Sequence, residues 1–298
     1  MTELENWLRR HRSPAEIKLV YGLRGIGKAE GVARFAAPDI VRLDFERPAL
    51  RRLKTACDVL EHLKAFRRDG VRDVLLNEPG RICGHTTLIR RLHEQGCWNI
   101  YATASSRHTA DDLSVHWPEC PLASYRAWRE TTGGAVRDLD RVWSDIYIYD
   151  VADGLEASCS RRFAALAEYY SDRIGEVVSN RRTSADFRLN GRYGCANLIG
   201  LYRRRLEDAF LVEFAACYDV FEEMEVRNRP KVFFTDLELR NWRFGDAPDD
   251  EETRLAQNRL YLELRRKFDR VWWPRDRPEY DFMTLGAHGA RKFWKVRV

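Results

Sequence analysis

Hydrophobic positions in the first third of the chain come in short runs that are followed by glycine or by polar residues. The run Ile17–Tyr21 ends at Gly22, Val74–Leu76 ends at Asn77, and Asn99–Ala102 continues into a polar turn. Short apolar runs bounded by turn residues are typical of strands buried in a parallel sheet. We therefore predict three strands of an α/β domain.

The middle of the chain changes to helical spacing. Apolar residues recur at every fourth position in the series Leu198, Tyr202, Leu206, Phe210 and Phe214. This spacing predicts one apolar stripe along a single long helix. A stripe of this kind is far more often a packed core face than a ligand site, so we assign it to the core.

The last part of the chain has the pattern of one helix followed by three strands. The acids Asp249–Glu252 and the bases Arg265–Lys267 frame the helix with charges that match its macrodipole. Its predicted buried face consists of Ala256, Leu260, Leu264 and Phe268. The strands are predicted at 271–273, 280–284 and 293–298, where prolines and a glycine turn separate the runs.

Composition agrees with a folded protein of two or three domains, since 44% of the 298 residues are hydrophobic and 12% are aromatic. No apolar run reaches the ~18 residues of a membrane span, and the first residues are polar and amphipathic rather than a signal peptide. We therefore expect a cytoplasmic protein with no membrane partner. The seven cysteines include no C-x-x-C pair, so we predict neither a disulfide framework nor a metal site.

The segment after the first predicted strand has the spacing of a phosphate-binding loop. Gly22 is followed, after four residues, by Gly27 and Lys28, with Gly25 between the two glycines. Glycines let the backbone fold back so that its N–H groups surround phosphate oxygens. Lys28 would reach the outer phosphates at the start of a helix, whose N-terminus favours anions. The expected ligand is ATP.

Two residues that hold magnesium in such sites are replaced. Ala29 stands where a hydroxyl normally contacts the metal, and the second strand ends in Asn77 rather than Asp. If each lost contact is worth about 2 kcal/mol, the two together lower the rate about a thousandfold. Magnesium is therefore not expected as a cofactor.

Two further residues are candidates for the chemistry of this site. Glu78 remains to polarise an attacking water. Ser105 lies in the turn 103–106, which is of the kind that senses a terminal phosphate, although in isolation it reads as an ordinary strand-to-loop turn.

In this order, the three pieces resemble the bacterial and archaeal AAA+ (P-loop) ATPases that carry a C-terminal restriction-endonuclease-like domain of unknown function. The family typically reads Gly-x4-Gly-Lys-Thr, then Asp-Glu, then Thr-Gly-Ser-Ser, then Pro-Leu-Ser-Phe. The matching segments extend over nearly the whole chain: Gly22–Lys28, Asn77–Glu78, Thr103–Ser106, Pro121–Tyr125, Leu206–Leu211, Phe234–Asp236, Leu239–Asn241, Tyr261–Leu264 and Glu279–Phe282.

The resemblance implies an α/β fold in three parts. These are a P-loop AAA+ type domain with a parallel sheet at 1–125, a helical winged-helix-like region at 126–230, and a small restriction-endonuclease-like α/β domain at 231–298. The family's Thr, Asp and Gly are replaced here by Ala29, Asn77 and Ala104, and the Gly-Arg that usually precedes Pro-Leu-Ser-Phe is absent. Loss of these residues within a retained framework is what an inactive or very slow ATPase would show.

Arginines are dense in the middle region. Between residues 181 and 205 a single acid, Asp186, stands against Arg181, Arg182, Arg188, Arg192 and Arg203–Arg205. Arginines so placed can neutralise DNA phosphates, and the first four are our predicted DNA contacts. The alternative is that an arginine-rich chain simply solvates its helices in this way.

Nuclease chemistry is not expected in the last segment. It requires an Asp on one strand, a Glu-x-Lys on the next and a divalent metal between the carboxylates. Asp281 and Glu263 are present, but no acid follows Asp281, and Lys295–Arg297 stands where Glu-x-Lys would be. These cations are instead candidates to pair with the two acids and hold the fold together.

The expected function is a nucleotide-dependent DNA- or protein-binding module that binds ATP through degenerate motifs and is a weak or inactive ATPase. One alternative is a slow magnesium-dependent ATPase in which Glu78 activates water. Another is an interaction scaffold that binds no nucleotide and keeps the loop as a tight strand-to-helix turn. Thermal stabilisation by ATP separates the scaffold from the other two.

Overall fold

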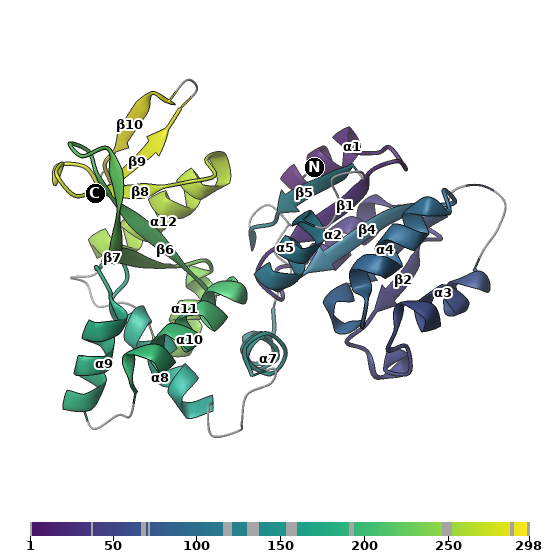
Figure 1. Ribbon diagram of the computed structural model, residues 1–298, viewed down its shortest axis with the longest axis horizontal. Coiled ribbons are helices and arrows are strands. Elements are labelled where there is room, and N and C mark those ends of the chain that lie inside the picture. Colours follow the sequence, from purple (N-terminus) through teal and green to yellow (C-terminus); the bar gives the residue numbers. More distant parts are fainter. Residues whose placement is uncertain are drawn as a thin grey trace. The chain divides into compact units, whose positions relative to one another are not determined.

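The computed structural model describes residues 2–36, 38–66, 70, 72–115, 121–129, 137–152, 160–190, 194–245, 252–286 and 289–296. The chain divides into two compact units, Met1–Asp138 and Leu139–Val298, and each contains a five-stranded sheet (Figure 1). Among the described helices, none combines the length and the apolar character that crossing a membrane requires.

The first unit is built on a parallel sheet with the strand order β2-β3-β4-β1-β5. Its strands are β1 Ile17–Tyr21, β2 Val41–Asp44, β3 Arg72–Asn77, β4 Trp98–Ala104 and β5 Leu122–Arg126. The three strands predicted from the short apolar runs are confirmed as β1, β3 and β4. Because all five strands run the same way, the loops after β1, β3 and β4 meet at one edge of the sheet.

Helices cover both faces of this sheet (Figure 1). They are α1 Glu3–Arg10, α2 Lys28–Phe35, α3 Ala56–Lys64, α4 His85–Glu94 and α5 Arg107–Val115, with short 3₁₀ turns η1 Pro48–Leu50 and η2 Pro79–Arg81. The usual right-handed crossovers place α2 on one face and α3, α4 and α5 on the other. On the second face, Val59, Leu88 and Leu113 from the helices join Leu76 and Ile100 from the strands in one core.

Local sequence explains where two of these helices begin. The Thr2 hydroxyl accepts a hydrogen bond from the Glu5 amide, and the Glu5 carboxylate accepts one from the Thr2 amide. Thr55 and Asp58 form the same reciprocal cap on α3. A cap of this kind contributes about 1 kcal/mol to stability.

The second unit combines helices with a mixed sheet in the order β10-β9-β8-β6-β7, in which β6 and β8 are parallel and the other pairs antiparallel. The strands are β6 Val212–Asp219, β7 Met224–Phe234, β8 Trp272–Pro274, β9 Phe282–Leu285 and β10 Arg291–Trp294. The helices are α7 Leu139–Asp145, the π-helical η3 Ile146–Val151, α8 Ser160–Ser171, α9 Asn180–Leu189, α10 Ala196–Asp208, α11 Leu237–Phe244 and α12 Glu252–Lys267.

The predicted helix and the first two predicted strands at the end of the chain are confirmed as α12, β8 and β9. The third strand, predicted at 293–298, shares only Phe293 and Trp294 with β10, and residues 297–298 lie outside the described residues. The predicted boundary between residues 230 and 231 falls inside β7. The division of the chain into three domains stays a prediction.

The single long helix predicted for the series from Leu198 to Phe214 is wrong. Helix α10 ends at Asp208, and Phe214 lies on β6. Phe210 has a left-handed backbone with φ 54°, and the Leu211 amide donates to the Leu206 carbonyl at 3.0 Å. This is a Schellman-type helix end, which usually carries glycine at the left-handed position. Because phenylalanine occupies that position here, the sequence carried no stop signal.

The buried face of α12 also differs from the prediction. Of the four predicted residues Leu264 is buried, and the others in the buried face are Asn258, Tyr261 and Leu262. Asn258 is buried because its amide bonds the Phe234 N–H and the Phe234 carbonyl, both at 2.8 Å. A polar side chain that satisfies two backbone groups is stable in a core.

Candidate functional site

The loop between β1 and α2 is shaped by three glycines. The Gly22 N–H donates to the Ala104 carbonyl at 3.1 Å, which ties the loop to the end of β4. The φ of Gly22 is 144°, and a Cβ there would lie 2.5 Å from the Ala127 carbonyl oxygen, so a larger residue does not fit. Gly25 and Gly27 have left-handed φ values of 72° and 92°, and Gly27 is the N-cap of α2. The result is a tight strand-to-helix turn.

Lys28 lies beneath this loop at the first position of α2. The residue is 5% exposed, and its Nζ donates to the Gly22 carbonyl, the Leu23 carbonyl and the Ser105 hydroxyl, each at 2.9 Å. These three contacts of the ammonium are with neutral oxygens. The helix N-terminus adds positive potential at the same place. An anion in the loop would therefore find a buried positive charge beside it.

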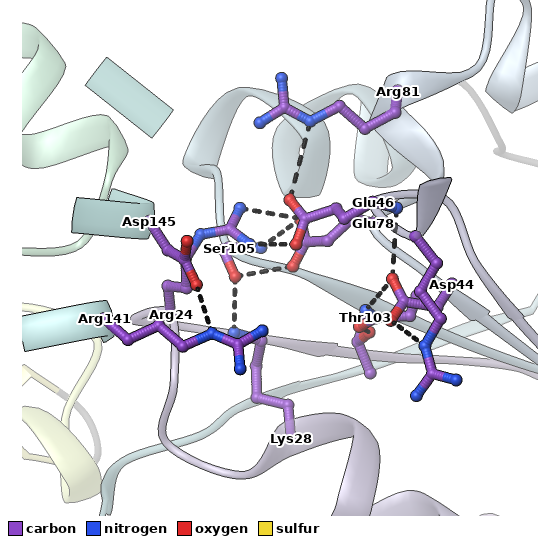
Figure 2. Close-up of polar contacts among 12 residues, drawn as sticks. Arg24, Lys28, Asp44, Glu46, Glu78, Arg81, Thr103, Ser105, Arg141 and Asp145 are labelled. Atoms are coloured by element: carbon purple, nitrogen blue, oxygen red, sulfur yellow. Dashed lines mark hydrogen bonds and ion pairs between the residues drawn. The ribbon is translucent and has the colours of Figure 1, made fainter. Parts of the chain in front are cut away.

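Glu78 and Ser105 continue this network. The Ser105 amide donates to Glu78 Oε2 at 3.0 Å, and the Ser105 hydroxyl donates to Oε1 at 2.6 Å. Glu78 is 7% exposed, and its backbone is left-handed with φ 56° and ψ 53°. Such a conformation costs a non-glycine residue about 1–3 kcal/mol and is concentrated at functional sites. Figure 2 shows Lys28, Ser105 and Glu78 as one continuous series of contacts.

Asn77, at the end of β3, is bound on both sides of its amide. Its Nδ2 donates to Asp44 Oδ1 at 2.9 Å, and its Oδ1 accepts from the Thr103 hydroxyl at 2.5 Å. The parallel register explains both contacts, because it pairs Asp44 with Asn77 and Asn77 with Thr103. The amide thus ties three neighbouring strand ends together.

Ala29 and Asn77 offer magnesium neither a hydroxyl nor a carboxylate. The ion needs oxygen ligands, usually including carboxylates. Ala29 has no side-chain oxygen, and Asn77 Oδ1 already accepts from Thr103. Within the described ranges, no group of three or more His, Cys, Asp or Glu side chains is arranged to hold a metal ion.

A cavity of about 400 Å³ opens beside Ala29 and Asn77. Ala29 and Asn77 both line it, together with Glu30, Arg42, Asp44 and Arg47. The cavity is thus lined by the methyl group of Ala29, the amide of Asn77 and the carboxylates of Glu30 and Asp44.

Arg24, inside the loop, brings a guanidinium to the same network. The residue is 7% exposed. It forms an ion pair with Glu46, and its Nη2 lies 4.0 Å from Glu78 Oε2. Glu46 Oε1 lies 3.8 Å from Arg81 Nε. Figure 2 shows Arg24 in contact with both Glu46 and Glu78, and Arg81 in contact with Glu46.

Sequence analysis identified Gly22, Gly25, Gly27, Lys28, Ala29, Asn77, Glu78 and Ser105 as site residues, and the structure brings them to one edge of the sheet. It missed Arg24, Asp44 and Glu46. The sequence pattern that could have revealed Asp44 is the run Val41–Asp44, which is a short strand pattern that ends in an acid. Recognising its role required the strand order.

In the second unit, Arg181, Arg182 and Arg188 lie on α9 and are exposed. Arg192 lies outside the described residues. Arg188 Nη2 donates to the Ser184 hydroxyl at 3.1 Å, which in turn donates to the Gly194 carbonyl at 2.7 Å. Helix α9 therefore presents several guanidinium groups to solvent.

Asp281 has a structural role in this unit. Its two carboxylate oxygens accept from Gln257 Nε2 at 2.6 Å and from the Val296 amide at 2.7 Å. The side chain thus connects α12 to the segment after β10. Glu263, the second predicted acid, is exposed on α12.

A scan against models of protein families finds none that matches the chain, and a search of curated proteins finds no matching relative.

Proposed function

We propose that the first unit binds the phosphates of ATP in the loop Gly22–Lys28 without a magnesium ion and hydrolyses the nucleotide slowly or not at all. The strand order β2-β3-β4-β1-β5, with the loop after β1, supports a P-loop fold of the AAA+ type. The observation that carries the proposal is the buried ammonium of Lys28 beneath the glycine turn.

The energetic argument concerns that ammonium. A buried charge is costly unless it is paired and hydrogen-bonded. The three neutral oxygens around Lys28 satisfy its N–H groups. A bound phosphate adds an opposite charge, and charge-assisted hydrogen bonds are roughly twice as strong as neutral ones. A polyphosphate at this loop would therefore gain a charge-assisted contact with Lys28.

Slow hydrolysis follows from the groups that surround the loop. Glu78, the candidate for activating water, is bound by the amide and the hydroxyl of Ser105. Ala29 and Asn77 do not supply the metal contacts that stabilise a transferring phosphoryl group. The two losses together account for about a thousandfold in rate.

Thermal unfolding of the full chain tests the nucleotide site. ATP at a hundred times its dissociation constant adds about 2.7 kcal/mol, which raises the Tm by several degrees. We expect this shift in EDTA and expect Lys28→Ala to abolish it. Lys64→Ala is the matched control, because Lys64 is exposed on α3. A shift that requires magnesium and a rate lost in Glu78→Gln would support the slow ATPase instead. If ATP does not change the Tm at all, the interaction scaffold that binds no nucleotide is the alternative that remains.

We propose DNA as a partner of the second unit, because three helices and a hairpin follow one another as in a winged-helix unit. Helices α8, α9 and α10 precede the hairpin of β6 and β7, and the segment before α9 bridges β7 at Ile174–Val232 and Val177–Lys231. The exposed arginines of α9 would contact phosphates. A protein partner at the same surface is the competing outcome.

Fluorescence anisotropy with a 20-base-pair duplex over a range of salt tests this partner. If Arg181, Arg182 and Arg188 each contact a phosphate, their replacement by Gln lowers the slope of log K against log salt by about 1 per residue. Arg51→Gln/Arg52→Gln in the first unit serves as the control, since both residues are exposed. An unchanged slope in the α9 variant would rule these contacts out.

A further inference from the structure

We infer that Arg24, rather than a metal ion, supplies the positive charge for the terminal phosphate of the nucleotide, and that this phosphate takes the place of Glu46 on the guanidinium. The inference rests on the proposed nucleotide site. It assigns the discrimination between nucleoside triphosphate and diphosphate to one side chain.

Arg24 occupies a position from which it can reach a terminal phosphate. It lies within the loop, two residues after Gly22, and its guanidinium extends to Glu78 at the end of β3. Lys28 reaches the same Glu78 from the other side through the Ser105 hydroxyl. The two cations therefore flank one region of the site (Figure 2).

Three basic side chains gather in this region. Arg24, Lys28 and Arg81 are the cations of the cluster, and Glu46 and Glu78 are its carboxylates. In ordinary sites of this fold a magnesium ion contributes positive charge beside the phosphates. Here Ala29 and Asn77 offer the ion neither a hydroxyl nor a carboxylate, and the guanidinium of Arg24 lies 4.0 Å from Glu78.

Glu46 is the partner that can be exchanged. An arginine fork binds carboxylate and phosphate with the same planar geometry, so a phosphate competes directly with Glu46. When it leaves Arg24, Glu46 still has Arg81 at 3.8 Å, and its side chain is 17% exposed. The ion pair with Arg81 therefore remains to Glu46 after the exchange. Glu78 stays in place because Ser105 holds it with two hydrogen bonds.

Isothermal titration of the full chain with ATP and with ADP, both in EDTA, tests the inference. The wild type should bind ATP more tightly than ADP. Arg24→Gln should weaken ATP about tenfold to a hundredfold, the usual effect of losing a hydrogen bond to a charged group, and should change ADP less than about threefold. Glu46→Gln should strengthen ATP binding, because it removes the competing carboxylate. Arg51→Gln, an exposed arginine in the same unit, should leave both affinities unchanged.

Three outcomes separate the possibilities. If Arg24→Gln keeps the wild-type ratio of ATP to ADP affinity, or if Glu46→Gln weakens ATP, the role of Arg24 is overturned while the nucleotide site stands. If the preference for ATP appears only with magnesium, the ion and not Arg24 supplies the charge. If the wild type binds neither nucleotide, the proposed function itself fails. Melting curves of each variant show whether it is folded, and the expected gain in Glu46→Gln cannot arise from misfolding.

Discussion

We predict that the free energy of unfolding of the first unit increases at alkaline pH because of Lys18. The residue lies on β1 with no exposed surface. Its Nζ donates to the Ser13 carbonyl, the Glu16 carbonyl and Asn99 Oδ1. Burial outweighs the favourable charges of Glu16 and Asp73 and lowers the pKa of Lys18 to about 8. The folded chain thus loses this proton more readily than the unfolded chain, whose lysine titrates at 10.5.

The magnitude and the sign follow from this difference in pKa. Below pH 8 both states hold the proton, so Lys18 adds no pH dependence. Between pH 8 and 10.5 the unfolded state binds a proton that the folded state has released, and the free energy of unfolding rises by about 1.4 kcal/mol per pH unit. The whole interval contributes about 3 kcal/mol. Burial raises the pKa of the neighbouring Tyr101 to about 12, so its hydroxyl stays neutral throughout.

Urea unfolding at several pH values between 7 and 10 checks this prediction in the wild type and in Lys18→Met. Every other titrating group is common to both proteins and cancels in the difference between their free energies of unfolding. That difference should be flat below pH 8 and should then rise with the slope given above. Carbon-13 NMR of labelled lysine side chains reports the pKa directly, since the chain has few lysines. A flat difference up to pH 10, or a Lys18 pKa near 10.5, would refute the reasoning.

Two further predictions concern packing. Gly22→Ala should destabilise the first unit by at least about 2 kcal/mol, because the added methyl group would lie 2.5 Å from the Ala127 carbonyl oxygen and the backbone conformation is unfavourable for alanine. The control is Gly96→Ala, since Gly96 has a left-handed φ but open space around it, and this change should lower the Tm less. Equal losses of Tm in the two variants would contradict the steric explanation. Asn258→Ala should cost about 2–4 kcal/mol in urea unfolding, because both backbone groups of Phe234 lose their partner. The exposed Asn197→Ala should stay within about 0.5 kcal/mol, and a similarly small effect at Asn258 would show that water satisfies Phe234.

Features that depend on neighbouring residues were predicted well. Strands β1, β3 and β4 are short apolar runs with a turn residue behind them, and α12 is framed by acids and bases. The break after α10 was missed for the opposite reason. A left-handed phenylalanine at position 210 is supported by the packing of buried Phe210 and Leu211, and no local preference of phenylalanine announces it.

By itself the sequence determined that a glycine turn with a lysine follows the first strand, and that Ala29 brings no hydroxyl and Asn77 no carboxylate to this place. Only the tertiary structure decided which charges surround that turn. The strand order sets Asp44 beside Asn77 in register, and the same packing brings Glu46 to Arg24 across 22 residues. Such pairings depend on how parallel strands are ordered in the sheet, which residue types and their spacing along the chain do not specify.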